Sequence, residues 1–258
     1  MSLLSSKTSH FLELLMEMTA RELNARYKNT IFGFVWALVN PCLQMVVISF
    51  VFRFIVKEPL PNYNLYLLSG LLVWNFFSST QSKAVSSIVN ERFLVKKANF
   101  PKEVIPLSIV LSGLLHLMAS FFVFILLLLF LGLLSSSFLP QIVLGCLILL
   151  ATSTGLALLT SALNVVYRDV SFFVQALLLI WFYVTPVVYA LNSIPEKVVW
   201  LWKLNPLTFV LQSFQSIISS FYTFDQNLII GNGALALLIL FSGIVVFRNK
   251  SKTFDDWL

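Results

Sequence analysis

Six long apolar runs divide this chain, and short polar or basic segments separate them. The runs cover residues 31–56, 65–89, 105–134, 142–166, 170–190 and 228–247. A bilayer core about 30 Å thick takes roughly 20 apolar residues at helical rise, so each run can span with some tilt. The pattern predicts an all-α membrane protein with six transmembrane helices, forming a single domain over residues 1–258.

The first two runs contain polar positions that need partners. Asn40-Pro41 lies in the middle of the first run, where proline removes a backbone donor and kinks the helix. The second run is polar in its second half, from Ser78 to Ser82, and Lys83 follows. Because lipid does not solvate such groups, we expect both segments to face protein or a watery cavity, with Lys83 reaching toward the interface.

Residues 10–28 precede the first run and are both apolar and charged. Apolar positions recur three and four residues apart, and Glu17–Arg21 and Glu22–Arg26 are acid-before-base pairs at helical spacing. The segment is too short and too charged to span. It predicts an amphipathic helix at the membrane interface, with a soluble arm docking on another chain as the alternative.

Residues 195–224, between the fifth and sixth runs, are broken at Asn205-Pro206 into two short apolar pieces. They predict re-entrant half-helices, and a seventh span is the alternative. With the N-terminus inside, twelve basic residues fall on the inner side and three on the outer side. This positive-inside distribution favours six spans and places both termini in the cytoplasm.

Composition agrees with a membrane protein and limits the chemistry. The chain is 59% hydrophobic and 11% charged, with a net charge of +6 carried mainly at the ends of apolar runs. That placement indicates topology and anionic lipid rather than nucleic acid. Neither a metal-binding pattern nor paired catalytic carboxylates occur, and no phosphate-binding GxxxxGK[ST] loop is present. We therefore expect no catalytic residue, metal or cofactor in this chain.

Aromatic residues are abundant, with 25 Phe, 6 Trp and 7 Tyr. Core packing and interfacial belts explain many of them. Clusters in the first, second and fifth runs could instead line one path for a sugar chain, because flat rings offer broad contact. The candidate lining residues are Phe32, Trp36, Trp74, Phe77, Trp181 and Tyr183. His116, inside the third run, is expected to make a structural hydrogen bond to a neighbouring helix.

Five stretches then resemble a known family in order and spacing. They are RYKNTIFGFVWALVNP, FLVKKANFPKEVIPL, ALNVVYRDV, VTPVVYALNSIPE and LNPLTFVLQSFQ. The chain resembles the permease subunit of bacterial ABC transporters that export lipid-linked polysaccharide, such as O-antigen, capsule and teichoic-acid exporters. The resemblance implies a channel of two permease copies in the inner membrane. It also implies two copies of a separate ATPase that holds ATP and Mg, and a glycan carried on undecaprenyl diphosphate.

The resemblance also assigns roles to two segments. A coupling helix that contacts the ATPase would lie between spans two and three, with Glu91, Arg92, Phe93, Leu94, Val95, Lys96 and Phe100. A plain basic loop is the alternative. A cytoplasmic gate for the lipid diphosphate would contain Arg26, Tyr27 and Lys28. Anchoring of these residues to anionic lipid is the alternative.

Other function classes fit the sequence less well. A related ABC permease exporting a drug or another lipid would have the same fold and a different cargo. A polyprenyl-phosphate-dependent membrane enzyme would need acidic residues grouped near the interface to hold a metal, and the acids here are scattered. A lipid scramblase would work without an ATPase.

Overall fold

The computed structural model describes residues 2–28, 33–55, 62–97, 100–133, 139–218 and 226–258. This part of the chain is helical and contains no strand. The long helices are α1 (Ser2–Tyr27), α2 (Trp36–Ile55), α3 (Tyr63–Ala84), α6 (Val104–Phe130), α7 (Leu139–Val166), α8 (Val170–Val184) and α11 (Gln226–Lys250). The short elements are η1 (Gly33–Val35), α4 (Ser87–Asn90), α5 (Arg92–Lys97), η3 (Leu191–Ser193), α9 (Val199–Lys203), α10 (Leu207–Gln215), η4 (Ser251–Thr253) and α12 (Phe254–Trp257).

Among the described residues, three helical segments are long and apolar enough to cross a membrane: Val104–Phe130, Leu139–Val166 and Gln226–Trp257. They correspond to the predicted third, fourth and sixth runs, which are thereby confirmed as long apolar helices. Trp36–Phe52 and Val170–Val184 are shorter apolar helices. Helix α3 is long enough, but the polar residues of its second half lower its average hydropathy below that of these segments.

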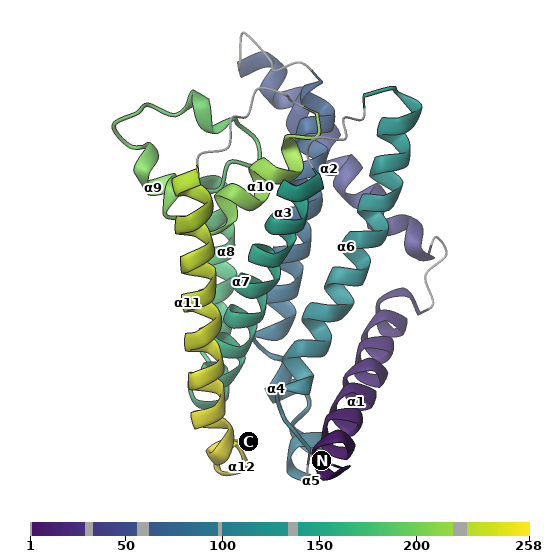
Figure 1. Ribbon diagram of the computed structural model, residues 1–258, viewed down its shortest axis with the longest axis vertical. Coiled ribbons are helices and arrows are strands. Elements are labelled where there is room, and N and C mark those ends of the chain that lie inside the picture. Colours follow the sequence, from purple (N-terminus) through teal and green to yellow (C-terminus); the bar gives the residue numbers. More distant parts are fainter. Residues whose placement is uncertain (1, 29–32, 56–61, 98–99, 134–138, 219–225) are drawn as a thin grey trace.

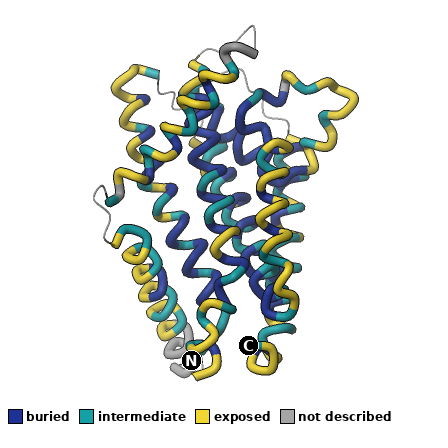
Figure 2. Tube along the Cα trace, turned by 180° about the vertical axis from the view of Figure 1, so that it is seen from behind, coloured by how far each residue is buried: buried dark blue, intermediate teal, exposed yellow. Residues whose placement is uncertain are grey.

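The helices are arranged along one long axis, with α5 and both chain termini at the same end (Figure 1). We call this the terminal end, and the opposite end, which carries α9 and α10, the far end. Helix α3 runs through the centre of the bundle, where 14 of its 22 residues are buried. Figure 2 shows the buried positions concentrated in the middle of the bundle and exposed positions on its outer helices.

The fifth run forms a shorter helix than predicted. It was expected to continue to residue 190, but α8 ends at Val184. Proline disfavours helical backbone at the residue before it, and Thr185, which precedes Pro186, is extended with φ −99° and ψ 134°. Residues 185–188 then turn inward and are buried against the core.

Helix α1 is longer than the predicted interfacial helix. It begins at Ser2 rather than near His10, and it lies along the lower half of α6 in Figure 1. Met18 and Thr19 are buried there, and Tyr27 at its C-terminal end reaches His116 of α6. The contact with α6 therefore fixes the direction of α1.

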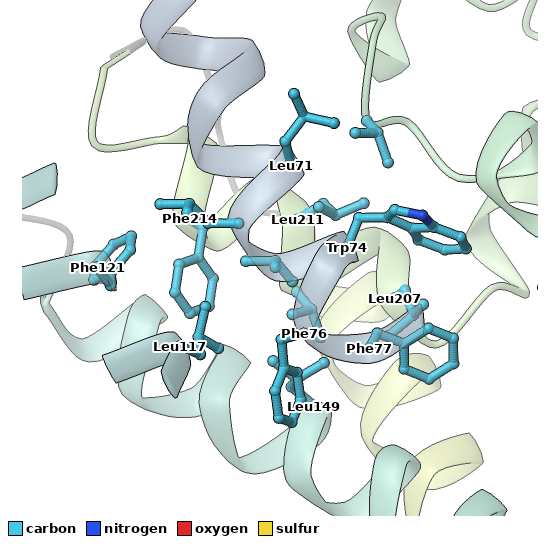
Figure 3. Packing of buried hydrophobic residues seen from close by; sticks show 14 of the residues in the cluster. Leu71, Trp74, Phe76, Phe77, Leu117, Phe121, Leu149, Leu207, Leu211 and Phe214 are labelled. Atoms are coloured by element: carbon cyan, nitrogen blue, oxygen red, sulfur yellow. The ribbon is translucent and has the colours of Figure 1, made fainter. Parts of the chain in front are cut away.

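Two large hydrophobic clusters and one small one, formed by Ala84, Ile109, Val110 and Ala157, occur among the described residues. The main core surrounds α3 and joins residues of α6, α7, α8 and α10 (Figure 3). Within it, the rings of Phe121 and Phe214 meet edge to face with centroids 4.9 Å apart. A second cluster, which we call the terminal core, joins α1, α4, α5, α6, α7, α11 and α12 through residues including Met18, Ile88, Val95, Phe247 and Phe254.

The small residues of the fourth run allow α7 and α11 to approach closely. A Cβ atom placed on Gly243 would lie 2.2 Å from the backbone oxygen of Gly155, so only glycine fits at this crossing. Lipid supplies little hydrophobic drive between helices, and close backbone packing of this kind contributes to their association.

Side-chain amides satisfy the broken backbone at the far end. Asn205 accepts hydrogen bonds from Leu207 N and Trp181 Nε1, both at 3.1 Å, and donates to Thr185 Oγ1 at 2.9 Å. Asn232 of α11 accepts from Phe209 N at 3.0 Å and donates to the Lys203 carbonyl at 2.8 Å. The two short helices predicted around Asn205-Pro206 are therefore present as α9 and α10, and residues 219–225 lie outside the described residues.

Candidate functional site

A cavity of about 1080 Å³ opens between α1, α2, α3, α6 and α8. Helix α3 supplies one long wall of this cavity, from Leu71 to Lys83. Along that wall the lining changes from apolar and aromatic residues toward the far end to Ser78, Ser79, Ser82 and Lys83 toward the terminal end. The prediction that the polar half of the second span faces protein or a cavity is confirmed.

The aromatic part of the lining comes from α2, α3 and α8. Trp74 lies against Phe182, with ring centroids 5.4 Å apart, and both line the cavity. Trp36 and Tyr183 line it as well, with 46% and 67% of their surfaces exposed. Three of the predicted lining residues, Trp36, Trp74 and Tyr183, are thus brought together around one space.

Two other predicted lining residues lie behind this wall. Phe77 is completely buried, and Trp181 meets it edge to face at 5.2 Å. The Trp181 indole also donates to the Asn205 side chain at the far end, so it points away from the cavity. The residues adjacent to them in sequence, Phe76 and Phe182, line the cavity instead, because adjacent side chains on a helix point in different directions. Phe32 lies outside the described residues.

Amide side chains supply the neutral polar part of the lining. Asn75 Nδ2 of α3 donates to Gln44 Oε1 of α2 at 3.1 Å, which joins the two helices across the cavity wall. Asn40 and Pro41 line the same space. Amides and aromatic rings side by side suit a ligand with many hydroxyl groups on apolar ring faces.

The end of the cavity nearest α1 is basic. Arg26, Lys83 and His116 line it, and no Asp or Glu is found among the described residues that line the cavity. The hydroxyl of Tyr27 is hydrogen-bonded to His116 Nδ1, and the two rings are stacked with centroids 6.1 Å apart. The predicted structural hydrogen bond of His116 to a neighbouring helix is confirmed. Of the three predicted gate residues, Arg26 and Tyr27 reach the cavity, whereas Lys28 is exposed outside it.

Burial raises the pKa of Tyr27, while the nearby Arg26 guanidinium opposes this shift. The net pKa lies above its ordinary value, so the phenol stays protonated at neutral pH. It can then donate to His116 and hold the C-terminal end of α1 against α6.

The segment predicted to contact an ATPase forms α5 at the terminal end. Phe93 is 66% exposed there, and the Arg92 guanidinium lies over its ring at 5.0 Å. Val95 faces inward and is buried in the terminal core, while Leu94 and Phe100 pack against that core. Of the three adjacent apolar residues among the predicted coupling residues, Phe93, Leu94 and Val95, Phe93 is therefore the one that extends outward, because adjacent side chains on a helix point in different directions.

Ion pairs hold α5 and its surroundings in place. Arg21 of α1 pairs with Glu91, just before α5. Lys102 Nζ contacts Asp255 Oδ1 of α12 at 2.9 Å, and Arg248 Nε lies 3.4 Å from Glu103 Oε1. Both the first and the last helices of the chain therefore brace this segment. Lys96 and Lys97 remain exposed beside them.

Sequence reasoning did not assign Lys83 or His116 to the same site as Arg26. Tyr27 and His116 are 89 positions apart, and only folding brings them together. The available signal was chemical rather than local, because an ionisable group within an apolar run indicates a functional site by default. Within the described residues, no three His, Cys, Asp or Glu side chains gather to hold a metal ion.

Comparison with known proteins gives a consistent set of relatives. The family described as "ABC-2 type transporter" matches residues 13–219. An O-antigen export system permease protein RfbA from Klebsiella pneumoniae is 34% identical over 212 residues, covering 81% of each chain. Another RfbA, from Myxococcus xanthus, is 29% identical over 94% of each chain. The polysialic acid transport protein KpsM of Escherichia coli is 24% identical over 90% of this chain and 91% of its own.

Proposed function

This chain belongs to the ABC-2 type transporter family, and on that premise we propose that it is the channel-forming permease of an ATP-driven polysaccharide exporter. Its cargo is a polysaccharide carried on undecaprenyl diphosphate, and its role is transport rather than catalysis. The main support for this proposal is the similarity to O-antigen export permeases along 81% to 94% of the chain.

The chemistry of the cavity supports this cargo. Aromatic rings from three helices and the Asn75–Gln44 amide pair can contact the faces and hydroxyl groups of a sugar without binding it tightly. A drug or another lipid as cargo is not favoured, since the relatives compared above are named for O-antigen or polysialic acid.

In the membrane, α2, α3, α6, α7, α8 and α11 are the six spans. Residues 195–218, the described part of the predicted re-entrant region, lie on the outer side, and both termini are cytoplasmic. Support comes from the position of both termini and α5 at the same end (Figure 1), where most basic residues also lie. The protein resides in the bacterial inner membrane.

The working exporter contains two copies of this chain and two copies of an ATP-binding subunit. ATP and Mg are bound and ATP is hydrolysed in that subunit, and this chain holds no cofactor. Phe93 of α5 is the apolar contact for the partner, supported by its 66% exposure at the terminal end. Arg26 and Tyr27, with Lys28 nearby, form the gate at which the lipid diphosphate enters.

Removal of the gene from its host tests the function. We expect lipid-linked polysaccharide to accumulate inside the cell and to disappear from the surface, and a plasmid copy to restore it. The glycan is measured by immunoblotting of intact cells and of spheroplast lysates. Unchanged surface glycan together with altered drug sensitivity would show that the proposed polysaccharide cargo is wrong.

Single cysteines test the topology in a background without Cys42 and Cys146. We expect cysteines at Asn62 and Lys197 to react with an impermeant thiol reagent applied from outside, and one at Lys97 to be protected. Labelling of a cysteine at Lys252 from outside would require an odd number of spans.

A further inference from the structure

A second exposed aromatic side chain lies near α5 at the terminal end. Trp257 of α12 is 54% exposed, and its indole makes no hydrogen bond or ring contact within the described part of the chain. The indole of Trp202 at the far end, by contrast, donates to the Tyr189 hydroxyl at 2.7 Å. Trp257 therefore presents a broad apolar ring and an N–H donor that a binding partner can use.

Helix α12 is held directly against α5 and the segment that follows it. Phe254 is completely buried in the terminal core, which includes residues of α5. Lys102, between α5 and α6, lies 5.9 Å from the centre of the Phe254 ring and contacts Asp255 Oδ1 at 2.9 Å. Trp257 and Phe93 are therefore exposed on two helices that contact each other at the terminal end (Figure 1).

The charges beside Trp257 favour a protein partner over the membrane surface. Tryptophan is common where helices meet the membrane interface, so a lipid contact is the alternative. However, Asp255 and Asp256 directly precede Trp257, and both are exposed. Asp255 is paired with Lys102, whereas Asp256 has no ion pair with any described residue. The negative surface potential of the cytoplasmic leaflet attracts basic segments and opposes a ring held beside an unpaired carboxylate.

We propose that Trp257 is a second apolar contact for the ATP-binding subunit, next to the contact made by Phe93. The identity of the partner rests on the proposed function, whereas the surface rests on two exposed rings and the contact between α5 and α12. Tryptophan is among the residues that contribute most to binding when a partner buries them. Two rings on separate helices also fix the orientation of a bound partner better than one ring does.

The test measures binding of the purified ATP-binding subunit to the full permease in phosphatidylcholine nanodiscs. We expect Trp257→Ala to weaken this binding on the order of tenfold, as the loss of an interface tryptophan predicts. Trp257→Phe keeps an aromatic ring and should lose less affinity. Trp200→Ala is the matched control, because Trp200 is 56% exposed at the far end and should not contact the subunit. All three variants should unfold at the normal temperature, since both side chains are exposed.

Replacing Trp257 by a photocrosslinking phenylalanine analogue distinguishes direct contact from an indirect effect. We expect this analogue to crosslink to the ATP-binding subunit, and the same analogue in place of Trp200 not to do so. Crosslinking to lipid alone would show that Trp257 anchors α12 to the membrane, and it would overturn the proposal. A loss of affinity in Trp257→Ala that appears only in nanodiscs with phosphatidylglycerol would have the same meaning. A crosslink between two permease copies without one to the subunit would also overturn it.

Normal binding of the ATP-binding subunit by Trp257→Ala would overturn the proposal as well. If Phe93→Asp weakens binding in the same assay while Trp257→Ala does not, α5 makes the contact without α12 and the proposed function stands. Failure of the function itself would appear differently, as normal surface glycan after gene removal and as no binding of the subunit by the unaltered permease.

Discussion

Two short helices at opposite ends of the bundle, α10 and α5, make very different contacts. All nine residues of α10 are buried, and amide side chains of Asn205 and Asn232 bind the backbone at its start. In α5 only Val95 is buried, and the helix is held by the terminal core on one side and ion pairs around it. Phe93 of α5 extends outward.

The difference is that α10 makes its contacts within this chain, whereas α5 leaves an apolar side chain exposed to solvent. Broken backbone within a membrane must be satisfied by protein, and the far end meets that demand with its own side chains. Phe93 at the terminal end is 66% exposed, and the contact shown for its ring is with the guanidinium of Arg92, also exposed. We therefore interpret α10 as a structural element that closes the far end of the bundle. We interpret α5 as a surface that binds another protein.

The largest effect is expected from Asn205→Ala at the far end. The substitution removes three hydrogen bonds and leaves Trp181 Nε1 and the Leu207 amide without their acceptor. Each unsatisfied buried donor costs about 1–3 kcal/mol, so we expect the two donors together to lower the free energy of unfolding by roughly 2–6 kcal/mol. Thermal unfolding in detergent measures it.

Asn90→Ala on α4 is the control, because it deletes the same amide from an exposed position at the terminal end. It should unfold like the unaltered protein. If Asn205→Ala also melts at the normal temperature, the amide does not hold the break between α9 and α10, and the contrast with α5 loses its basis.

The next effect is expected from Phe93→Asp, which should abolish export without lowering stability. A charge would replace the one apolar group that α5 presents outward, and an apolar groove on a partner would reject it. Co-purification of the ATP-binding subunit and surface glycan are both measured. The substitution is limited to Phe93, since Leu94 packs against the terminal core.

Two further variants sharpen this result. Phe93→Leu should keep most of the export, because it preserves an apolar contact. Val95→Asp should instead destabilise the protein, because Val95 is only 2% exposed in the terminal core. If Phe93→Asp exports glycan and co-purifies with the ATP-binding subunit normally, α5 does not bind that subunit through Phe93.

The sequence predicted those parts of the fold that depend on local composition. The third, fourth and sixth runs became α6, α7 and α11 because each is long, apolar and free of an internal break. Pro186 ended α8 early, and this could have been predicted from the restriction on the residue before proline. The direction of α1 could not, because it depends on Tyr27 meeting a histidine on α6.

The sequence predicted which helices supply aromatic residues to the candidate site, but not which individual aromatic residues face the cavity. Aromatic clusters correctly indicated α2, α3 and α8, since Trp36, Trp74 and Tyr183 share one cavity. Which ring of each cluster faces that space depends on helix rotation, and rotation is set by packing against neighbours. Phe77 is therefore turned into the core, although it is only three positions from Trp74.

A smaller effect is expected from Trp36→Leu in the cavity between the two ends. The substitution keeps apolar volume but removes a ring surface that is 46% exposed, so stability should change little. We expect shorter or slower-exported glycan chains at a normal level of folded protein. Chain length is measured by gel electrophoresis of the surface glycan, normalised to the permease in the membrane.

Trp181→Leu is the matched variant for this comparison. Its indole donates to Asn205 and packs on Phe77, so leucine there should lower stability and leave the chain length exported per folded molecule unchanged. If both variants change the chain length equally, the effect does not depend on whether a ring lines the cavity, and the proposed role of the lining rings is wrong.

The smallest effect is expected from Asp255→Asn, which breaks the 2.9 Å ion pair between α12 and Lys102. Asp255 is 62% exposed, and an exposed ion pair is worth about 0–1 kcal/mol, so the unfolding temperature should fall only slightly. The difference should shrink further as salt is raised, because ions screen exposed charges. Asp256→Asn removes the same charge from the neighbouring exposed residue, for which the described part of the chain shows no ion pair.

A salt-sensitive loss of partner binding in Asp255→Asn but not in Asp256→Asn would show that α12 positions α5. Identical behaviour of the two variants would leave the terminal core as the support of α5, and both ends of the bundle would then depend on buried contacts.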